Sequence, residues 1–76
     1  MHSLNVLGNI YLIQELIRTE LAGIDNAYGF ILNLLPHSIA EFRIRCSSHQ
    51  LIELQKLSYI TSIEEIRNDS IFKKIK

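Results

Sequence analysis

The sequence contains few of the residues on which small extracellular domains depend. Of its 76 residues only Cys46 is a cysteine, so no disulfide can form within the chain. A secreted domain of this size normally relies on several disulfides. The N-terminus also lacks a basic segment before its apolar run and a small-residue cleavage site, so no signal peptide is expected. We therefore expect a cytoplasmic protein.

A long uncharged hydrophobic run is also missing. The best candidate, residues 21–35, is interrupted by Asp25, Asn26 and two glycines, so no membrane span is predicted. Eight basic and eight acidic side chains give zero net charge, and hence no overall field that would attract nucleic acid. Residues 36–76 nevertheless carry seven basic and five acidic side chains. The second half is therefore the better candidate for contact with phosphate.

Recognisable catalytic and metal-binding motifs are absent as well. His2, His37 and His49 do not have the spacing of a ligand set, and one cysteine does not complete a structural zinc site. No phosphate-binding loop, dinucleotide fingerprint or serine nucleophile motif occurs. Cys46 with His37 or His49 would make a nucleophile and a base, but a small buried hydrophobic residue is the more usual role. We expect a protein that binds other macromolecules, with no enzymatic activity, cofactor or metal.

Hydrophobic residues are abundant and make up 47% of the chain. A chain of this length is expected to form a single domain over residues 1–76, whose small core cannot hide so much apolar surface. Part of that surface should therefore contact another protein. Homodimerisation is one way in which a small domain gains stability, so both a homodimer and a protein partner are predicted.

Signals for helix N-termini recur along the chain. Three capping boxes occur, each a Ser or Thr followed three residues later by Glu or Gln. They are Ser38/Glu41, Ser47/Gln50 and Thr61/Glu64. They predict short helices over residues 38–45, 49–57 and 62–67, with Pro36 stopping the element before them. Residues 71–76 are predicted to add a last turn or a frayed tail.

The N-terminal segment is predicted to form a longer helix over residues 3–21. Its apolar residues fall on adjoining stripes at helical spacing. They are Leu4, Leu7, Ile10, Tyr11, Ile13 and Ile17. Because this face is wider than one small core can cover, we predict that it is the dimerisation surface. With a second apolar helix over residues 27–35, the sequence predicts an all-α bundle of four to five helices, a long N-terminal helix followed by short capped ones.

The two short helices that flank Cys46-Ser47-Ser48 suggest a helix-turn-helix. In that interpretation the second helix presents polar side chains to DNA, since Gln can read adenine and Lys can hold phosphate. The predicted DNA- or partner-binding residues are Arg43, Arg45, His49, Gln50 and Lys56. Ordinary packing of two helices in a bundle is the alternative, and the pattern alone favours it. The turn contains no glycine, and Glu53 would repel phosphates.

Several segments resemble FlhD, the small helical subunit of the enterobacterial flagellar activator of transcription. The matching residues are Met1-His2, Val6-Leu7, Ile10-Tyr11 and Ile13, then Ala27, Phe30 and Leu32, then Ile39-Ala40, the QLIEL of residues 50–54 and the IRND of residues 66–69. His49 stands where the family has proline. The resemblance implies an all-helical homodimer that binds a second, DNA-contacting subunit and activates transcription.

These observations predict a helical, dimeric, transcription-regulatory subunit that acts on DNA together with a protein partner. The alternative belongs to a different class of protein. It is a helical adaptor, secretion chaperone or small inhibitor that binds another protein and has no role with nucleic acid.

Overall fold

Buried and accessible residues alternate, with a repeat of two, along two segments of the chain. The structure is a computed structural model and describes residues 1–66. In β1 (His2–Asn9) and β3 (Ile39–Cys46) every second residue is buried. A repeat of two places alternate side chains on opposite faces of a sheet. With β2 (Tyr28–Leu35) and β4 (Ile60–Ile66), these strands form a four-stranded sheet.

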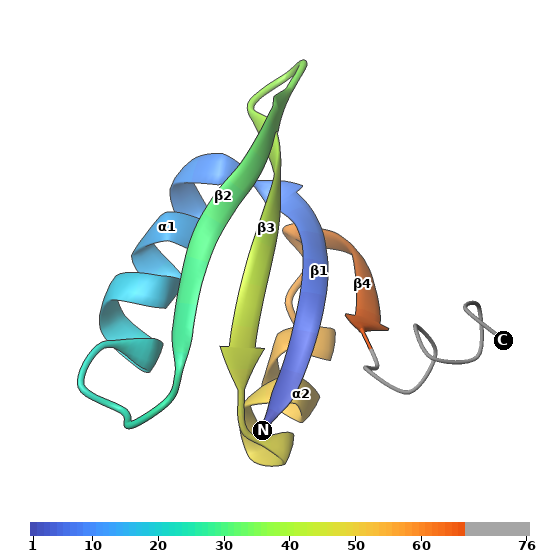
Figure 1. The fold of residues 1–76 in the computed structure, drawn as a ribbon. Helices are drawn as coiled ribbons and strands as arrows, with labels where there is room; N and C mark the ends of the chain where they lie inside the picture. Colours follow the sequence, from blue (N-terminus) through green and yellow to red (C-terminus); the bar gives the residue numbers. More distant parts are fainter. Residues whose placement is uncertain (67–76) are drawn as a thin grey trace, which may run out of the picture.

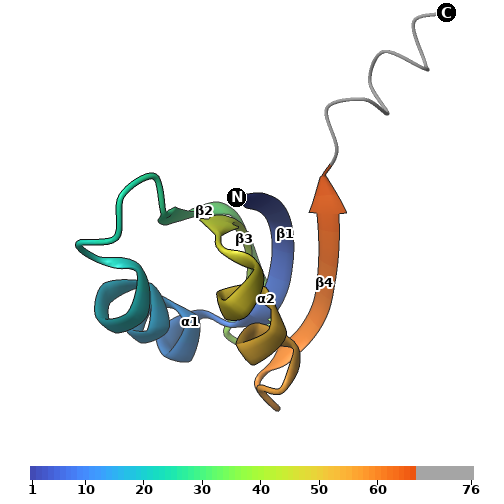
Figure 2. The ribbon, with the colours of Figure 1, turned by 90° about the horizontal axis from the view of Figure 1, so that it is seen from below.

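The sheet has the order β2-β3-β1-β4, and every neighbouring pair is antiparallel. The helical segments are α1 (Ile10–Leu16), which continues into the five-residue π-helix η1 (Ile17–Leu21), and α2 (Ser48–Gln55). Figures 1 and 2 show both α-helices on the same face of the sheet, and no element of residues 1–66 covers the other face. A β-α-β-β-α-β chain with this strand order has the ferredoxin-like, split βαβ arrangement.

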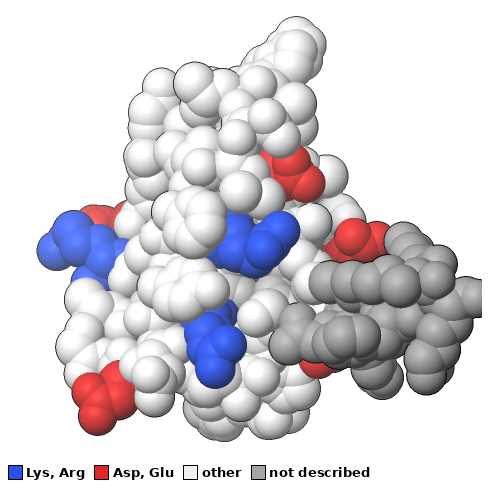
Figure 3. Space-filling model, viewed as in Figure 1, with Lys and Arg blue, Asp and Glu red and all other residues white. Residues whose placement is uncertain are grey.

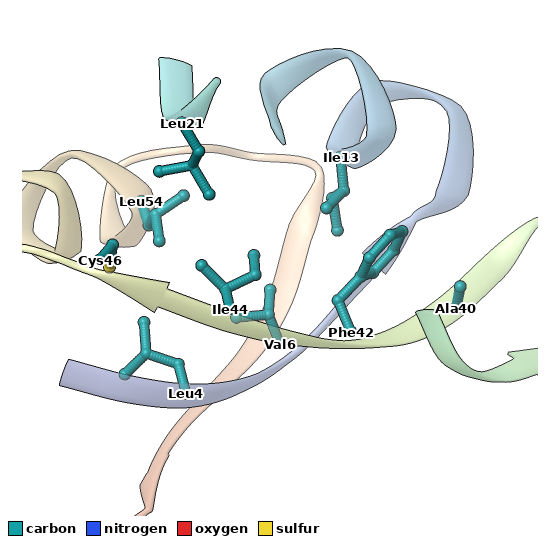
Figure 4. Packing of buried hydrophobic residues seen from close by; sticks show 9 residues of the cluster. All are labelled: Leu4, Val6, Ile13, Leu21, Ala40, Phe42, Ile44, Cys46 and Leu54. Atoms are coloured by element: carbon teal, nitrogen blue, oxygen red, sulfur yellow. The ribbon is translucent and has the colours of Figure 1, made fainter. Parts of the chain in front are cut away.

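The core lies between the helices and the covered face of the sheet, which we call the inner face. Strands β1 and β3 contribute most of it, and each helical segment adds one buried side chain (Figure 4). Its members are Leu4, Val6, Ile13, Leu21, Ala40, Phe42, Ile44, Cys46 and Leu54. Among the described residues no polar or charged side chain is buried, so the inner face is stabilised by apolar contacts.

Side-chain caps start both α-helices. The Asn9 side chain accepts hydrogen bonds from the backbone N–H groups of Tyr11 and Leu12, each at 3.0 Å, and so turns β1 directly into α1. At α2 the predicted capping box is confirmed. The Ser47 side chain accepts from the Gln50 backbone N–H, and the Gln50 side chain accepts from the Ser47 backbone N–H.

The prediction of an all-α bundle is wrong. The helix predicted over residues 3–21 is divided at Asn9, because residues 2–9 form β1 and only residues 10–21 are helical. The segments 27–35, 38–45 and 62–67, all predicted as helices, correspond to β2, β3 and β4. Of the predicted short helices only 49–57 is confirmed, as α2. The all-helical fold that the FlhD resemblance implies is therefore not observed.

Two of the three predicted capping boxes belong to other structures. Ser38 lies in the β2–β3 turn, where His37 and Ser38 have φ values of 64° and 61° and the Ile39 N–H donates to the Pro36 carbonyl. Two successive positive φ values are typical of a type I′ hairpin turn. Thr61 lies in β4, and its hydroxyl donates to the Leu7 carbonyl at 3.1 Å. Ser38 therefore forms part of the hairpin turn, and Thr61 links β4 to β1, so neither residue starts a helix.

No helix in residues 1–66 is long and apolar enough to cross a membrane. The last turn or tail predicted for residues 71–76 lies outside the described residues.

Candidate functional site

The second face of the sheet, which we call the open face, carries side chains that no helix of residues 1–66 covers. Cross-strand pairing places Tyr28 opposite Arg45 and Phe30 opposite Arg43. Arg43 also pairs with Asn5 on β1. Directly opposed residues of antiparallel strands share a face, so an aromatic edge strand lies beside a basic central strand.

Tyr28 and Phe30 form an exposed aromatic pair on β2. Their ring centroids are 5.8 Å apart and their planes differ by 20°, so the rings are stacked. Tyr28 is 44% exposed and Phe30 is 50% exposed, although aromatic rings are usually buried in a core or an interface. The two rings therefore offer flat apolar surface to a ligand.

Arg43 and Arg45 provide the positive charge of the open face. Both side chains are half-buried on β3, and the Arg43 Nε–H donates to the Asn5 Oδ1 at 2.9 Å, which fixes the direction of that guanidinium. Within residues 1–66 neither arginine forms an ion pair with a carboxylate. Figure 3 shows basic side chains in the middle of this face, over the central strand. The positive charge of the open face is therefore centred on β3.

The carboxylates of the open face lie to either side of these arginines. Glu41 lies two residues closer to the β2–β3 turn, and its Oε1 accepts a hydrogen bond from Asn33 Nδ2 at 2.7 Å. Glu64 lies on β4, opposite Asn5. The centre of the face is therefore a group of four side chains that combines two rings with two guanidinium groups. We call Tyr28, Phe30, Arg43 and Arg45 the aromatic–arginine cluster.

The structure separates the five residues predicted to bind DNA or a partner. Arg43 and Arg45 lie together on the open face, whereas His49, Gln50 and Lys56 belong to α2 or its C-terminal end, on the other side of the sheet. The helix-turn-helix interpretation is wrong, because the first of its two helices is strand β3. No single surface therefore contains all five residues.

The surroundings of α2 are unfavourable for phosphate. A pocket of about 370 Å³ separates η1 from α2, and both His49 and Gln50 line it together with the carboxylates of Glu20 and Glu53. Gln50 is already committed to the capping box, and Lys56 pairs with Glu53 at 3.7 Å. Acidic side chains at the rim repel an anion, and the capping box occupies N–H groups that would otherwise bind one.

The residues predicted to form a dimerisation stripe do not share one surface. Leu4 and Ile13 are fully buried in the chain's own core, and Ile10 and Ile17 pack against that core. Leu7 lies on the open face, opposite Glu41, while Tyr11 is 68% exposed on α1. The division of the segment into a strand and a helix disperses the stripe. Self-association itself stays a prediction.

Cys46 is a free, fully buried residue on the inner face, which confirms its predicted role in packing. Burial raises the pKa of its thiol, and the negative charge of Glu65 acts in the same direction. A thiol with a raised pKa is a poor nucleophile at neutral pH. Within residues 1–66 there is also no group of three or more His, Cys, Asp or Glu side chains that could hold a metal ion.

The aromatic half of the cluster was missed at the level of sequence. The helix predicted over residues 27–35 would place Tyr28 and Phe30 on different faces. In a strand, residues two apart share a face, and the Tyr-Gly-Phe spacing is the signal that would have brought the rings together. Comparisons with models of protein families, with curated proteins and with solved structures yield no match.

Proposed function

We propose that this protein is a non-catalytic binding module that holds single-stranded nucleic acid on the open face of its sheet. The aromatic–arginine cluster is the observation that carries the proposal. Unpaired bases stack on exposed aromatic rings whatever their sequence, while nearby basic side chains bind the phosphates. Four-stranded sheets with aromatic rings on an open face are one of the widespread surfaces that bind RNA in this way.

The geometry favours a single strand over a duplex. Tyr28 and Phe30 present ring faces, and a base can reach a ring face only when it is not stacked inside a double helix. Arg43 and Arg45 lie one strand further in, opposite the two rings. A strand lying over the sheet would thus place bases on β2 and phosphates over β3.

The neutral composition of the chain limits the strength of this binding. Only two guanidinium groups lie in the cluster, and Glu41 and Glu64 share the face with them. Electrostatic attraction to phosphates supplies much of the affinity of nucleic-acid-binding proteins. We therefore expect weak, salt-sensitive binding by one copy of the chain. Such modest affinity is consistent with a regulatory role in which a protein partner adds to the binding. The lone thiol is consistent with a cytoplasmic protein, because thiols stay reduced there.

Fluorescence anisotropy with labelled pyrimidine oligonucleotides, as single-stranded RNA, single-stranded DNA and duplex, tests the proposal. Wild-type protein should bind at least one of the single strands and prefer it to the duplex. Phe30→Ala should weaken binding roughly ten-fold, because a stacked base contributes about 1–3 kcal/mol. Arg43→Ala with Arg45→Ala should lower the slope of log affinity against log salt by about 1.4, as expected for two phosphate contacts on a single strand.

Lys56→Ala provides the matched control, since it removes a basic residue from the helical side of the molecule. Its affinity for the oligonucleotides should equal that of the wild type. Failure of every single strand to bind at low salt would refute the proposal. So would equal losses from Lys56→Ala and from the paired arginine substitutions, because that result would indicate unspecific attraction to positive charge.

A further inference from the structure

The two edges of the sheet differ in chemistry, and the difference singles out β2. β2 has the sequence YGFILNLL and carries no charged residue, whereas β4, ITSIEEI, carries Glu64 and Glu65. Edge strands expose unpaired N–H and C=O groups, and charged side chains are a common means of preventing a second strand from pairing there. β4 has that protection, and β2 lacks it.

β2 also exposes more apolar surface than a solitary edge strand requires. Five of its eight residues are large hydrophobic side chains that remain between 38% and 71% exposed. They are Tyr28, Phe30, Leu32, Leu34 and Leu35. Tyr28, Phe30 and Leu35 lie on the open face and Leu34 lies on the inner face, so apolar side chains flank this edge on both faces of the sheet. Exposed apolar surface of this kind marks an interaction site. A second strand paired along β2 would satisfy its free backbone N–H and C=O groups and would also bury part of its apolar side chains.

We propose that β2 pairs with β2 of a second copy of this chain, antiparallel about a two-fold axis, to form a continuous eight-stranded sheet. Two copies of β2 meet without charge repulsion, whereas two copies of β4 would bring four glutamates together. The two-fold pairing is self-complementary, which is the usual symmetry of a homodimer. Backbone hydrogen bonds along the strand and apolar contacts on both faces stabilise it.

The bulge in β2 determines which part of the strand lies at the axis. The register with β3 shifts between Ile31 and Asn33, so Leu32 is the extra residue and the strand bends there. The regular segment is Tyr28–Ile31. Opposed residues share a face, so the pairing sets Tyr28 and Phe30 of one copy beside the rings of the second copy on a shared open face.

The interface differs from the helical stripe predicted from the sequence, and it forms without nucleic acid. Its consequence for the proposed function is a binding face of doubled length, with two aromatic–arginine clusters. Two linked clusters bind one long strand more tightly than either does alone. The interface is tested in the absence of nucleic acid, so its failure and the failure of the binding proposal give separate results.

Sedimentation equilibrium of the chain alone, between micromolar and millimolar concentrations, is the first experiment. The wild type should reach twice the 8.8 kDa mass of one chain. Leu32→Lys places a charge at the edge outside the aromatic–arginine cluster and should raise the dimer dissociation constant at least ten-fold. Ile52→Lys is the matched control, because Ile52 is an exposed apolar residue on α2, 52% exposed, and its dimer should equal that of the wild type.

Hydrogen exchange of the wild type, followed amide by amide at low and high concentration, keeps the proposal testable if Leu32→Lys does not fold. Amides of Tyr28–Ile31 should gain protection as concentration rises, and those of β4 should not. A monomer throughout the concentration range overturns the proposal. So does a dimer whose protection falls on β4 or α2, or one that Leu32→Lys leaves as strong as the wild type while folded.

Discussion

Phe42 and Phe30 lie on neighbouring strands and face opposite sides of the same sheet. Phe42 is fully buried on the inner face, under α1, whereas Phe30 is 50% exposed on the open face beside Arg43. Both α-helices of residues 1–66 cover the inner face (Figure 2). The same residue type therefore supports the fold in one place and is available to a ligand in the other.

This division separates stability from binding within a single sheet. The nine buried hydrophobic residues of the described core lie on the inner face or on the helical segments that cover it. The open face combines apolar rings with charged and amide groups that water can reach. Substitutions on the inner face should therefore lower stability, whereas substitutions on the open face should weaken binding.

The largest expected effect comes from truncating the buried ring. Phe42→Ala should lower the free energy of unfolding by about 3–5 kcal/mol, through lost burial and the cavity left behind. A small domain has little more stability than that, so the variant should be largely unfolded. Phe30→Ala should cost less than about 1 kcal/mol, because half of its surface is already in water. Urea denaturation followed by circular dichroism measures both, and equal losses would show that the two faces do not differ as described.

Added volume on the inner face should have the next largest effect. A Cβ at Gly8 would lie 2.4 Å from the Tyr59 carbonyl oxygen and 3.0 Å from the Ile60 Cα, both backbone atoms. Gly8→Ala should therefore cost about 1–3 kcal/mol, because the start of β4 must move. Gly29→Ala is the matched control, since the atoms nearest to its Cβ would belong to the Ile17 side chain, which can change rotamer. A smaller fall in melting temperature is expected for Gly29→Ala, and the reverse order would contradict this explanation.

The stability and thiol reactivity of Cys46 variants and wild type measure how completely this end of the inner face is buried. Cys46→Ala should cost about 1 kcal/mol, within the usual range for a small core truncation. The thiol should react with iodoacetamide far more slowly in the native protein than in urea, because burial raises its pKa and limits access. The folded state holds the thiol proton more tightly, so stability should fall as pH rises through the ordinary thiol range. Rapid native labelling would place Cys46 outside the core.

The β2–β3 turn should give the smallest effect, and in the opposite direction. Ser38 has a φ of 61°, a conformation that glycine adopts without the steric cost of a side chain. Ser38→Gly should raise the free energy of unfolding by about 0.5–1 kcal/mol, as measured in urea. Ser62→Gly, the same change inside β4, should lower it by a similar amount. If both variants lose stability, positive φ at residue 38 is not a source of strain.

The hairpin also matters because it sets which side chains reach each face. A slip of one residue in the β2–β3 register, with β3 still paired to β1, would move Tyr28 and Phe30 to the inner face. The turn and the bulge after Ile31 together fix that register. The aromatic–arginine cluster therefore depends on backbone geometry more than on its own contacts.

Helix N-terminal signals in the sequence were reliable in one of three places. Ser47/Gln50 starts α2 as predicted, whereas Ser38/Glu41 and Thr61/Glu64 have the same letters and lie in a turn and a strand. Residues 39–46 alternate strictly between apolar and polar from Ala40 onward, which is the pattern of a half-buried strand. The capping box predicts a helix in this segment and the alternation predicts a strand, and the structure follows the alternation.

The sequence by itself determined the helix from Ser47, the helical character of residues 10–21, the burial of Cys46 and the basic character of residues 43–45. These depend on local hydrogen bonds or on the apolar nature of one residue. Only the tertiary structure decided that β1 and β3 lie side by side at the centre of a sheet, and that Tyr28 and Phe30 meet Arg45 and Arg43 across two strands. The backbone groups of a strand form hydrogen bonds with other strands and not within the strand itself. Whether a segment becomes a strand, and which face its side chains point to, therefore depends on segments that are distant in the chain.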